Sequence, residues 1–65
     1  MTLTNREMEV LQLIVKELTT EEIAENLHVS IATVESHRRN MFRKVGVQSV
    51  VGLLKEAIKH KWIKI

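Results

Sequence analysis

The segment SIATVESHRRNM, residues 30–41, carries side chains that could recognise the edges of base pairs. It supplies a carboxylate at Glu35, a hydroxyl at Ser36 and a guanidinium at Arg39. At about 100° per residue, these three side chains and that of Arg43 fall on one side of a helix. A carboxylate accepts a hydrogen bond from the amino group of cytosine, and an arginine donates to guanine. The spacing therefore fits base reading, although an ordinary solvated helix face has the same pattern.

Glu35 has two interpretations that the sequence leaves open. It precedes Arg39 by four residues, with the acid nearer the N-terminus. This order favours an exposed ion pair worth only about 0.3 kcal/mol. Alternatively, Glu35 accepts a hydrogen bond from cytosine and penalises wrong bases, because a carboxylate without a role would be costly near phosphates.

Two capping boxes predict where the first two helices begin. Thr4 is followed three residues later by Glu7, and Thr19 by Glu22. Each pair can satisfy the free N–H groups of a helix start reciprocally. Behind the first box, apolar residues recur at three- and four-residue steps that are typical of a helix: Met8, Leu11, Ile14, Val15 and Leu18.

Two further helices follow from capping residues in the second half. Ser30 and Ser49 can each cap a helix start, and Gly46 can supply the left-handed residue that commonly ends a helix. No segment has the alternation of a strand. We therefore predict an all-α, compact four-helix domain that covers residues 1–65. The predicted helices span residues 5–17, 20–27, 31–45 and 50–61.

Composition restricts the function classes. The 65 residues include no Cys and no Pro, so we expect one small domain without disulfides. Neither a cleavable signal nor an apolar run of membrane-spanning length is present, which predicts a soluble cytoplasmic protein. We expect no metal or other cofactor, because no Cys or Asp could complete a site with the histidines. We also expect no enzyme, because Ser36 and His37 lack an orienting acid and an enclosed pocket.

Charge is distributed unevenly along the chain. Residues 1–29 contain two basic and six acidic side chains, and residues 30–65 contain eight basic and two acidic ones. The balances of −4 and +6 predict a polyanionic partner for the second half. The segment GLLKEAIKHKWIKI, residues 52–65, could instead lie on a membrane surface, and the fold could also serve as a protein-binding module. We favour DNA because Arg38, Arg39 and Arg43 lie on the predicted reading helix itself.

The junction between the second and third predicted helices is typical of a helix-turn-helix. Only His28, Val29 and Ser30 separate the two helices, and Ala24 is small where their backbones must cross. The words LTNREMEVLQLI, EEIAENLHVSIATVESH and KVGVQS, in this order, resemble the LuxR/FixJ-type (GerE-like) domain over nearly the whole chain. Sigma-factor DNA-binding regions share some of these sequence motifs, but the order of the motifs and the fourth predicted helix favour the LuxR/FixJ type.

The resemblance implies a transcription regulator that binds double-stranded DNA, as the output domain of a two-component response regulator. It implies base contacts from Glu35, Ser36 and Arg39. The family's fourth helix commonly makes a homodimer, so we expect an interface there, and RNA polymerase is a further expected partner. The resemblance also implies that five residues lie near phosphates: Thr20, Ser30, Thr33, Asn40 and Lys44. We add Arg38 and Arg43 to this set because of their positive charge. Residues expected at the dimer interface are Val50, Val51 and Leu54.

Five positions depart from the family pattern, and the first is Asn5, where the family often has proline. Glu17 stands where the family usually has a helix-ending glycine, which predicts a strained or different end to the first helix. Glu21 and Glu35 stand at positions where the family often has lysine, so we expect this domain to attract phosphate less strongly. Val50 replaces an arginine and enlarges the apolar surface of the fourth helix.

Overall fold

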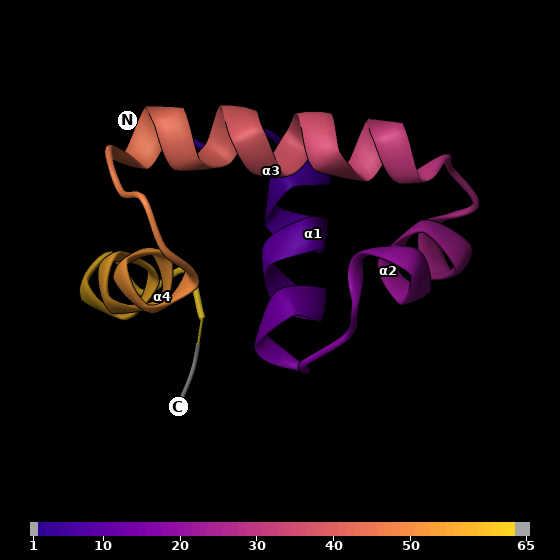
Figure 1. Ribbon diagram of the computed structural model, residues 1–65. Helices are drawn as coiled ribbons and strands as arrows, with labels where there is room; N and C mark the ends of the chain where they lie inside the picture. Colours follow the sequence, from indigo (N-terminus) through magenta and orange to yellow (C-terminus); the bar gives the residue numbers. More distant parts are fainter. Residues whose placement is uncertain (1, 64–65) are drawn as a thin grey trace.

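The computed structural model describes residues 2–63 and contains, within that range, four α-helices and no strand. The all-α prediction is confirmed. The longest helix, α3, contacts each of the other three, and Figure 1 shows it lying across them with all three on one side. Its opposite side is therefore not covered by the other three helices. The helices are α1 (Asn5–Val15), α2 (Thr20–Leu27), α3 (Ile31–Val45) and α4 (Val50–Lys59).

The four helix starts lie where the capping residues predicted them. In each case a side-chain hydroxyl oxygen accepts a hydrogen bond from the backbone N–H three residues later. The capping hydroxyls are those of Thr4, Thr19, Ser30 and Ser49. Both predicted capping boxes also form. The N–H of Thr4 donates to Glu7 Oε1 at 2.9 Å, and that of Thr19 donates to Glu22 Oε1 at 2.8 Å.

Two helices end earlier than predicted. We expected α1 to reach residue 17 and α4 to reach residue 61, but they end at Val15 and Lys59. The reason is that Glu17 and Lys61 adopt left-handed backbone conformations, with φ of 65° and 62°, which a right-handed helix cannot contain. The predicted strain after α1 is thus confirmed, since a side chain in this region costs roughly 1 kcal/mol where glycine would cost little.

All four helices terminate through the same hydrogen-bond pattern. After α1, the N–H of Leu18 donates to the carbonyl of Leu13 at 3.2 Å, across the left-handed residue. Equivalent bonds follow the other helices and satisfy carbonyls that would otherwise lack partners. These bonds join Val29 to Ala24, Val47 to Phe42 and Trp62 to Ala57. Only Gly46, among the four left-handed residues within 2–63, is the glycine that this geometry favours.

One apolar core joins the helices and fixes the orientation of α3. Val34 and Met41 of α3 are fully buried in it, and Ala24 is buried where α2 meets α3, as its small size predicted. Gln12 Nε2 donates to the carbonyl of Trp62 at 2.9 Å, which ties the segment after α4 to α1. The buried apolar residues are Leu3, Val10, Leu11, Ile14, Ile23, Ala24, Val34, Met41, Leu53, Ala57 and Ile63.

Within residues 2–63, none of the helices combines the length and the apolar character that crossing a membrane requires.

Candidate nucleic-acid interface

The helix-turn-helix consists of α2, a turn of three residues and α3. His28 follows α2 in the left-handed conformation, with φ of 58°, and reverses the direction of the chain. Ser30 then caps α3, with its Oγ accepting from the N–H of Thr33 at 3.1 Å. The apolar contact between α2 and α3 holds the two helices together beneath the exposed side of α3.

The inner and outer sides of α3 separate as the residue spacing predicted. Val34 and Met41 are buried, and His37 is half-buried on the same side. The predicted base-reading residues Glu35, Ser36 and Arg39 are all exposed on the outer side. A rigid helix therefore presents a carboxylate, a hydroxyl and a guanidinium together, which is a set of donors and acceptors suited to base edges. Their contact with bases stays a prediction.

Glu35 has no ion-pair partner among residues 2–63. The ion pairs in that range join Arg6 to Glu9, Lys44 to Glu7 and His60 to Glu56. The predicted alternative, a pair between Glu35 and Arg39, is therefore not formed. The carboxylate of Glu35 lies on an exposed face where both of its oxygens can accept hydrogen bonds from a ligand.

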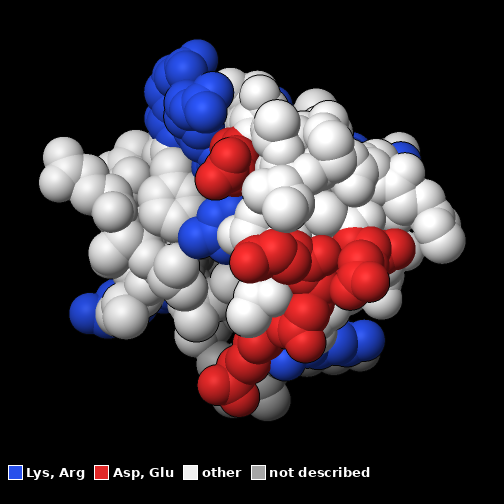
Figure 2. Space-filling view, turned by 45° about the vertical axis from the view of Figure 1, so that its right-hand side comes forward, with Lys and Arg blue, Asp and Glu red and all other residues white. Residues whose placement is uncertain are grey.

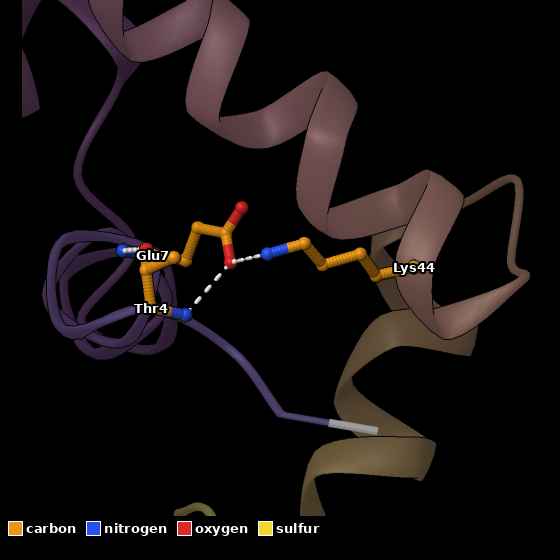
Figure 3. Close-up of polar contacts among 3 residues, drawn as sticks. All are labelled: Thr4, Glu7 and Lys44. Atoms are coloured by element: carbon orange, nitrogen blue, oxygen red, sulfur yellow. Dashed lines mark hydrogen bonds and ion pairs between the residues drawn. The ribbon is translucent and has the colours of Figure 1, made fainter.

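Lys44, which the resemblance implied would lie near phosphate, forms an ion pair with a buried carboxylate. Its Nζ lies 2.8 Å from Oε1 of Glu7, and the Glu7 side chain is only 3% exposed (Figure 3). The same oxygen accepts the Thr4 N–H, so one acid caps α1 and joins it to the last turn of α3. The Lys44 side chain is still 38% exposed, and its contact with phosphate stays a prediction.

The environment of Glu7 favours its ionised form. Burial by itself would raise the pKa of this carboxyl. The hydrogen bond from Lys44, the backbone hydrogen bond from Thr4 and the positive charge of Lys44 together outweigh that effect, and the pKa is lowered. Glu7 is thus held as a carboxylate by contacts from two different helices.

Sequence reasoning recognised Glu7 as a capping residue but missed its burial and its partner. The signal was present in the apolar periodicity of α1. Glu7 precedes Val10, Leu11 and Ile14 at the steps of three and four that define the buried side of this helix. An acid on that side requires a cation nearby, but the spacing along α1 cannot identify which cation.

The other residues expected near phosphates lie in different settings. The hydroxyls of Ser30 and Thr33 are 2.9 Å apart and hydrogen-bond one another at the start of α3. The guanidinium of Arg38 lies 5.8 Å from the centre of the Phe42 ring, within cation–π range, and its side chain is half-buried. Arg38 is therefore less free to move than the exposed Arg43. Thr20 is half-buried, and Asn40 is exposed.

Acidic side chains cover a separate face of the molecule. The exposed residues Glu21, Glu22 and Glu25 all belong to α2, and Figure 2 shows a large acidic patch on this side, with one smaller acidic patch set apart between basic side chains. Phosphates would be repelled there. The electrostatics therefore favour an approach by DNA to the outer side of α3, which carries Arg39 and Arg43.

The fourth helix presents exposed apolar side chains. Val51 is 64% exposed, Ile58 44% and Val50 36%, whereas Leu54 is half-buried. Monomeric proteins seldom leave several neighbouring aliphatic side chains in water, so this stripe is a candidate for contact with another molecule. Val50, where the resemblance implies an arginine, adds to this apolar surface.

The C-terminal segment does not continue α4 as a membrane-surface helix would. After Lys59 the chain turns, and Trp62 packs against the core and stacks on His60 with ring centres 4.8 Å apart. Trp62 is therefore partly buried against the core. The last residues of the segment, 64 and 65, lie outside the described part of the chain. Among residues 2–63, no cluster of His, Cys, Asp or Glu side chains could hold a metal ion.

Comparisons with known proteins agree with this geometry. The family model described as "Bacterial regulatory proteins, luxR family" matches residues 1–57. The response regulator ChrA of a haem-sensing two-component system has a similar structure. Its crystal structure superposes with a TM-score of 0.89 at 30% identity, over 97% of this chain and 31% of that chain.

Three curated relatives are similar in sequence. The regulatory protein MctR of Rhizobium johnstonii is 43% identical over 89% of this chain, and the response regulatory protein YgeK of Escherichia coli is 49% identical over 88%. The oxygen regulatory protein NreC of Staphylococcus aureus is 42% identical over 95%. The chain spans only 27%, 39% and 29% of these relatives, respectively. Its helix-turn-helix, its four-helix architecture and the family match over 57 residues show that the chain belongs to the luxR family of bacterial regulatory proteins, as a DNA-binding helix-turn-helix domain.

Proposed function

We propose that this domain reads double-stranded DNA by placing α3 in the major groove, as the output unit of a two-component response regulator in the cytoplasm. The outer side of α3 carries the proposal, because Glu35, Ser36 and Arg39 are exposed there while the inner side is fixed in the core. The relative MctR is named as a transcriptional regulatory protein, which supports a role in transcription. We further propose RNA polymerase as a partner. We propose no catalytic activity.

Base reading would combine attraction with exclusion. Arg39 can donate two hydrogen bonds to O6 and N7 of guanine, and Glu35 can accept one from N4 of cytosine. A base that offers Glu35 an acceptor instead of a donor leaves the carboxylate unsatisfied, which penalises that sequence. The absence of an ion pair between Glu35 and Arg39, within residues 2–63, supports separate contacts for the two side chains.

Selection of bound duplexes from a random pool tests this proposal. We expect a consensus with G·C pairs. Glu35→Gln should lower the discrimination between right and wrong bases at one base pair by roughly 1–3 kcal/mol. Glu25→Gln removes an equally exposed acid from α2 and is the matched control. It should leave every position of the consensus unchanged. If Glu35→Gln selects the same consensus as the original protein, Glu35 reads no base.

Phosphate contacts are tested by the dependence of affinity on salt. Each neutralised phosphate contributes a slope of about −0.9 to the plot of log affinity against log salt. Replacing the exposed Arg43 by Ala should weaken binding to all sequences alike and flatten that slope. A loss confined to one base position would make the replaced residue a base reader.

We propose that the apolar stripe on α4 joins two copies of the domain on paired half-sites. Val51 and Val50 are its most exposed predicted members, and burying them against a second copy would remove them from water. Val51→Glu should abolish the dimer and reduce paired-site binding more than half-site binding, because the second domain loses its high effective concentration. Sedimentation on a palindromic site measures this, and a strict one-to-one complex of the original protein would refute the dimer.

The membrane alternative is distinguished by direct titration. Mixed-sequence duplex and anionic vesicles are each titrated at two salt concentrations. We expect binding to the duplex only, because Trp62 is packed, partly buried, against the core. Binding to vesicles alone would reverse the assignment.

A further inference from the structure

Ile31 is an exposed aliphatic side chain in an unusual place. It is 46% exposed, and the other large exposed apolar side chains within residues 2–63 all lie on α4. Ile31 instead begins α3, at the end of the helix that adjoins α2 (Figure 1). Neither the core nor the proposed dimer interface accounts for its exposure.

The position of Ile31 relative to the proposed base readers is fixed by the helix. Ile31, Glu35 and Arg39 are spaced four residues apart and are all exposed, so they form one row along α3. Helix rise places Ile31 about 6 Å from Glu35 along the axis of α3. The Ser30 cap holds the first turn of α3 in helical geometry, so the backbone position from which the Ile31 side chain projects is fixed.

The major groove offers one kind of apolar group to such a side chain. Thymine carries a C5-methyl group on its major-groove edge, whereas the other bases present hydrogen-bond donors and acceptors there. The first turn of a recognition helix is the part that contacts base edges in helix-turn-helix proteins. An isoleucine in that turn gains free energy only if an apolar surface covers it.

We propose that Ile31 is a specificity-determining residue that reads a thymine methyl group next to the G·C positions contacted by Glu35 and Arg39. This inference rests on the proposed function of α3 and extends it to an A·T pair in each half-site. Specificity there arises because a cytosine, which lacks the methyl group, leaves the isoleucine facing water or polar atoms.

Ile31 also borders a shallow groove between α2 and α3 that could bind a protein segment. Besides Ile31, the residues that line the groove are Glu21, Ala24, Glu25, His28, Val29 and Ser30. Its two exposed glutamates, Glu21 and Glu25, would be drawn to a basic partner. The row formed with Glu35 and Arg39 favours DNA, and a contact made in the groove would be insensitive to the methyl group of a thymine.

The test uses the duplex selected from the random pool and replaces each thymine in turn by deoxyuridine, which removes only the methyl group. Affinities are measured by fluorescence anisotropy at one salt concentration. We expect one replacement to weaken the original protein about fourfold, the effect expected for burial of one methyl group. Ile31→Ala should bind the thymine and deoxyuridine duplexes equally, and more weakly than the original protein binds the thymine duplex.

Ile58→Ala is the matched control, because Ile58 is 44% exposed but lies on α4. It should retain the fourfold ratio between the two duplexes. Helical content measured by circular dichroism establishes that Ile31→Ala is folded, which its exposed position favours.

Two outcomes would overturn the inference while leaving the proposed function intact. One is a selected duplex in which no deoxyuridine replacement changes affinity. The other is a thymine effect that persists in Ile31→Ala, which would assign the methyl contact to another residue. Failure to select any duplex would instead refute the proposed function itself.

Discussion

The two capping boxes of this protein have the same local chemistry and different surroundings. At the start of α1, Glu7 is 2% exposed and binds both the Thr4 N–H and the ammonium of Lys44. At the start of α2, Glu22 is exposed and binds the N–H of Thr19. Both boxes define a helix start, but only the first also joins two helices. The comparison shows that one sequence motif can carry either a local or a long-range role.

The difference follows from the side of the helix that each glutamate occupies. Glu7 lies on the buried side of α1, where desolvation would destabilise an unpaired carboxylate. Its interactions are therefore stronger than those of an exposed pair, and loss of either partner leaves a polar group without compensation. Glu22 faces water, which can replace the hydrogen bond that the box supplies.

The largest expected effect on stability comes from removing the cation that pairs with the buried carboxylate of Glu7. Lys44→Met removes the ammonium and leaves Glu7 with the Thr4 N–H, which should lower the free energy of unfolding by about 2 kcal/mol. Urea denaturation measures this. The double variant Glu7→Gln with Lys44→Met should lose clearly less than the sum of the two single variants, because the charged group is then absent. Simple additivity would show that the two side chains do not interact in solution.

A second test replaces the glutamate of each capping box by glutamine and compares the losses of stability. Glu7→Gln should destabilise the domain by about 1.5 kcal/mol, because it weakens two hydrogen bonds in a buried setting. Glu22→Gln should cost no more than about 0.5 kcal/mol, because its amide oxygen can still cap α2 in water. Thermal unfolding of both variants under one set of conditions gives the contrast. Equal losses would contradict the long-range role assigned to Glu7.

At their C-terminal ends, in contrast, α1 and α2 have the same geometry, so a glycine substitution there should change the stability of the domain equally. Both helices are followed by an exposed residue in the left-handed conformation, Glu17 or His28, with φ of 65° and 58°. Glu17→Gly and His28→Gly should each stabilise the domain by about 1 kcal/mol, since glycine adopts this conformation without strain. Gly46→Ala, which places a side chain at φ of 79°, should destabilise it. Unfolding midpoints of the three variants provide the measurement.

The smallest expected effect is a difference in pH dependence. The folded-state pKa of Glu7 is lowered from 4.5, so its ionisation stabilises the folded state above that value. This stabilisation is lost as the pH falls through the lower folded-state pKa. The original protein should therefore lose more stability than Glu7→Gln on acidification below about pH 4.5. Identical acid unfolding profiles would show that Glu7 makes no such contribution.

Much of the candidate site could be predicted because it depends on local helix geometry. The turn before α3, the Ser30 cap and the division of α3 into inner and outer sides all follow from residues close together in sequence. Glu35 and Arg39 were identified by their type and spacing, but whether they pair depends on side-chain conformations that spacing does not determine. The setting of Lys44 could not be predicted, because its partner lies 37 residues earlier in the chain.

The sequence by itself determined where the four helices begin, because capping groups and apolar periodicity act within a few residues. It also identified the helix-turn-helix and the outer side of α3. Only the tertiary structure decided where α1 and α4 end, because chain reversal into the core places Glu17 and Lys61 in left-handed conformations. The same folding buried Glu7 and brought Lys44 to it, since pairing across helices depends on how their surfaces pack and on the free energy of desolvation.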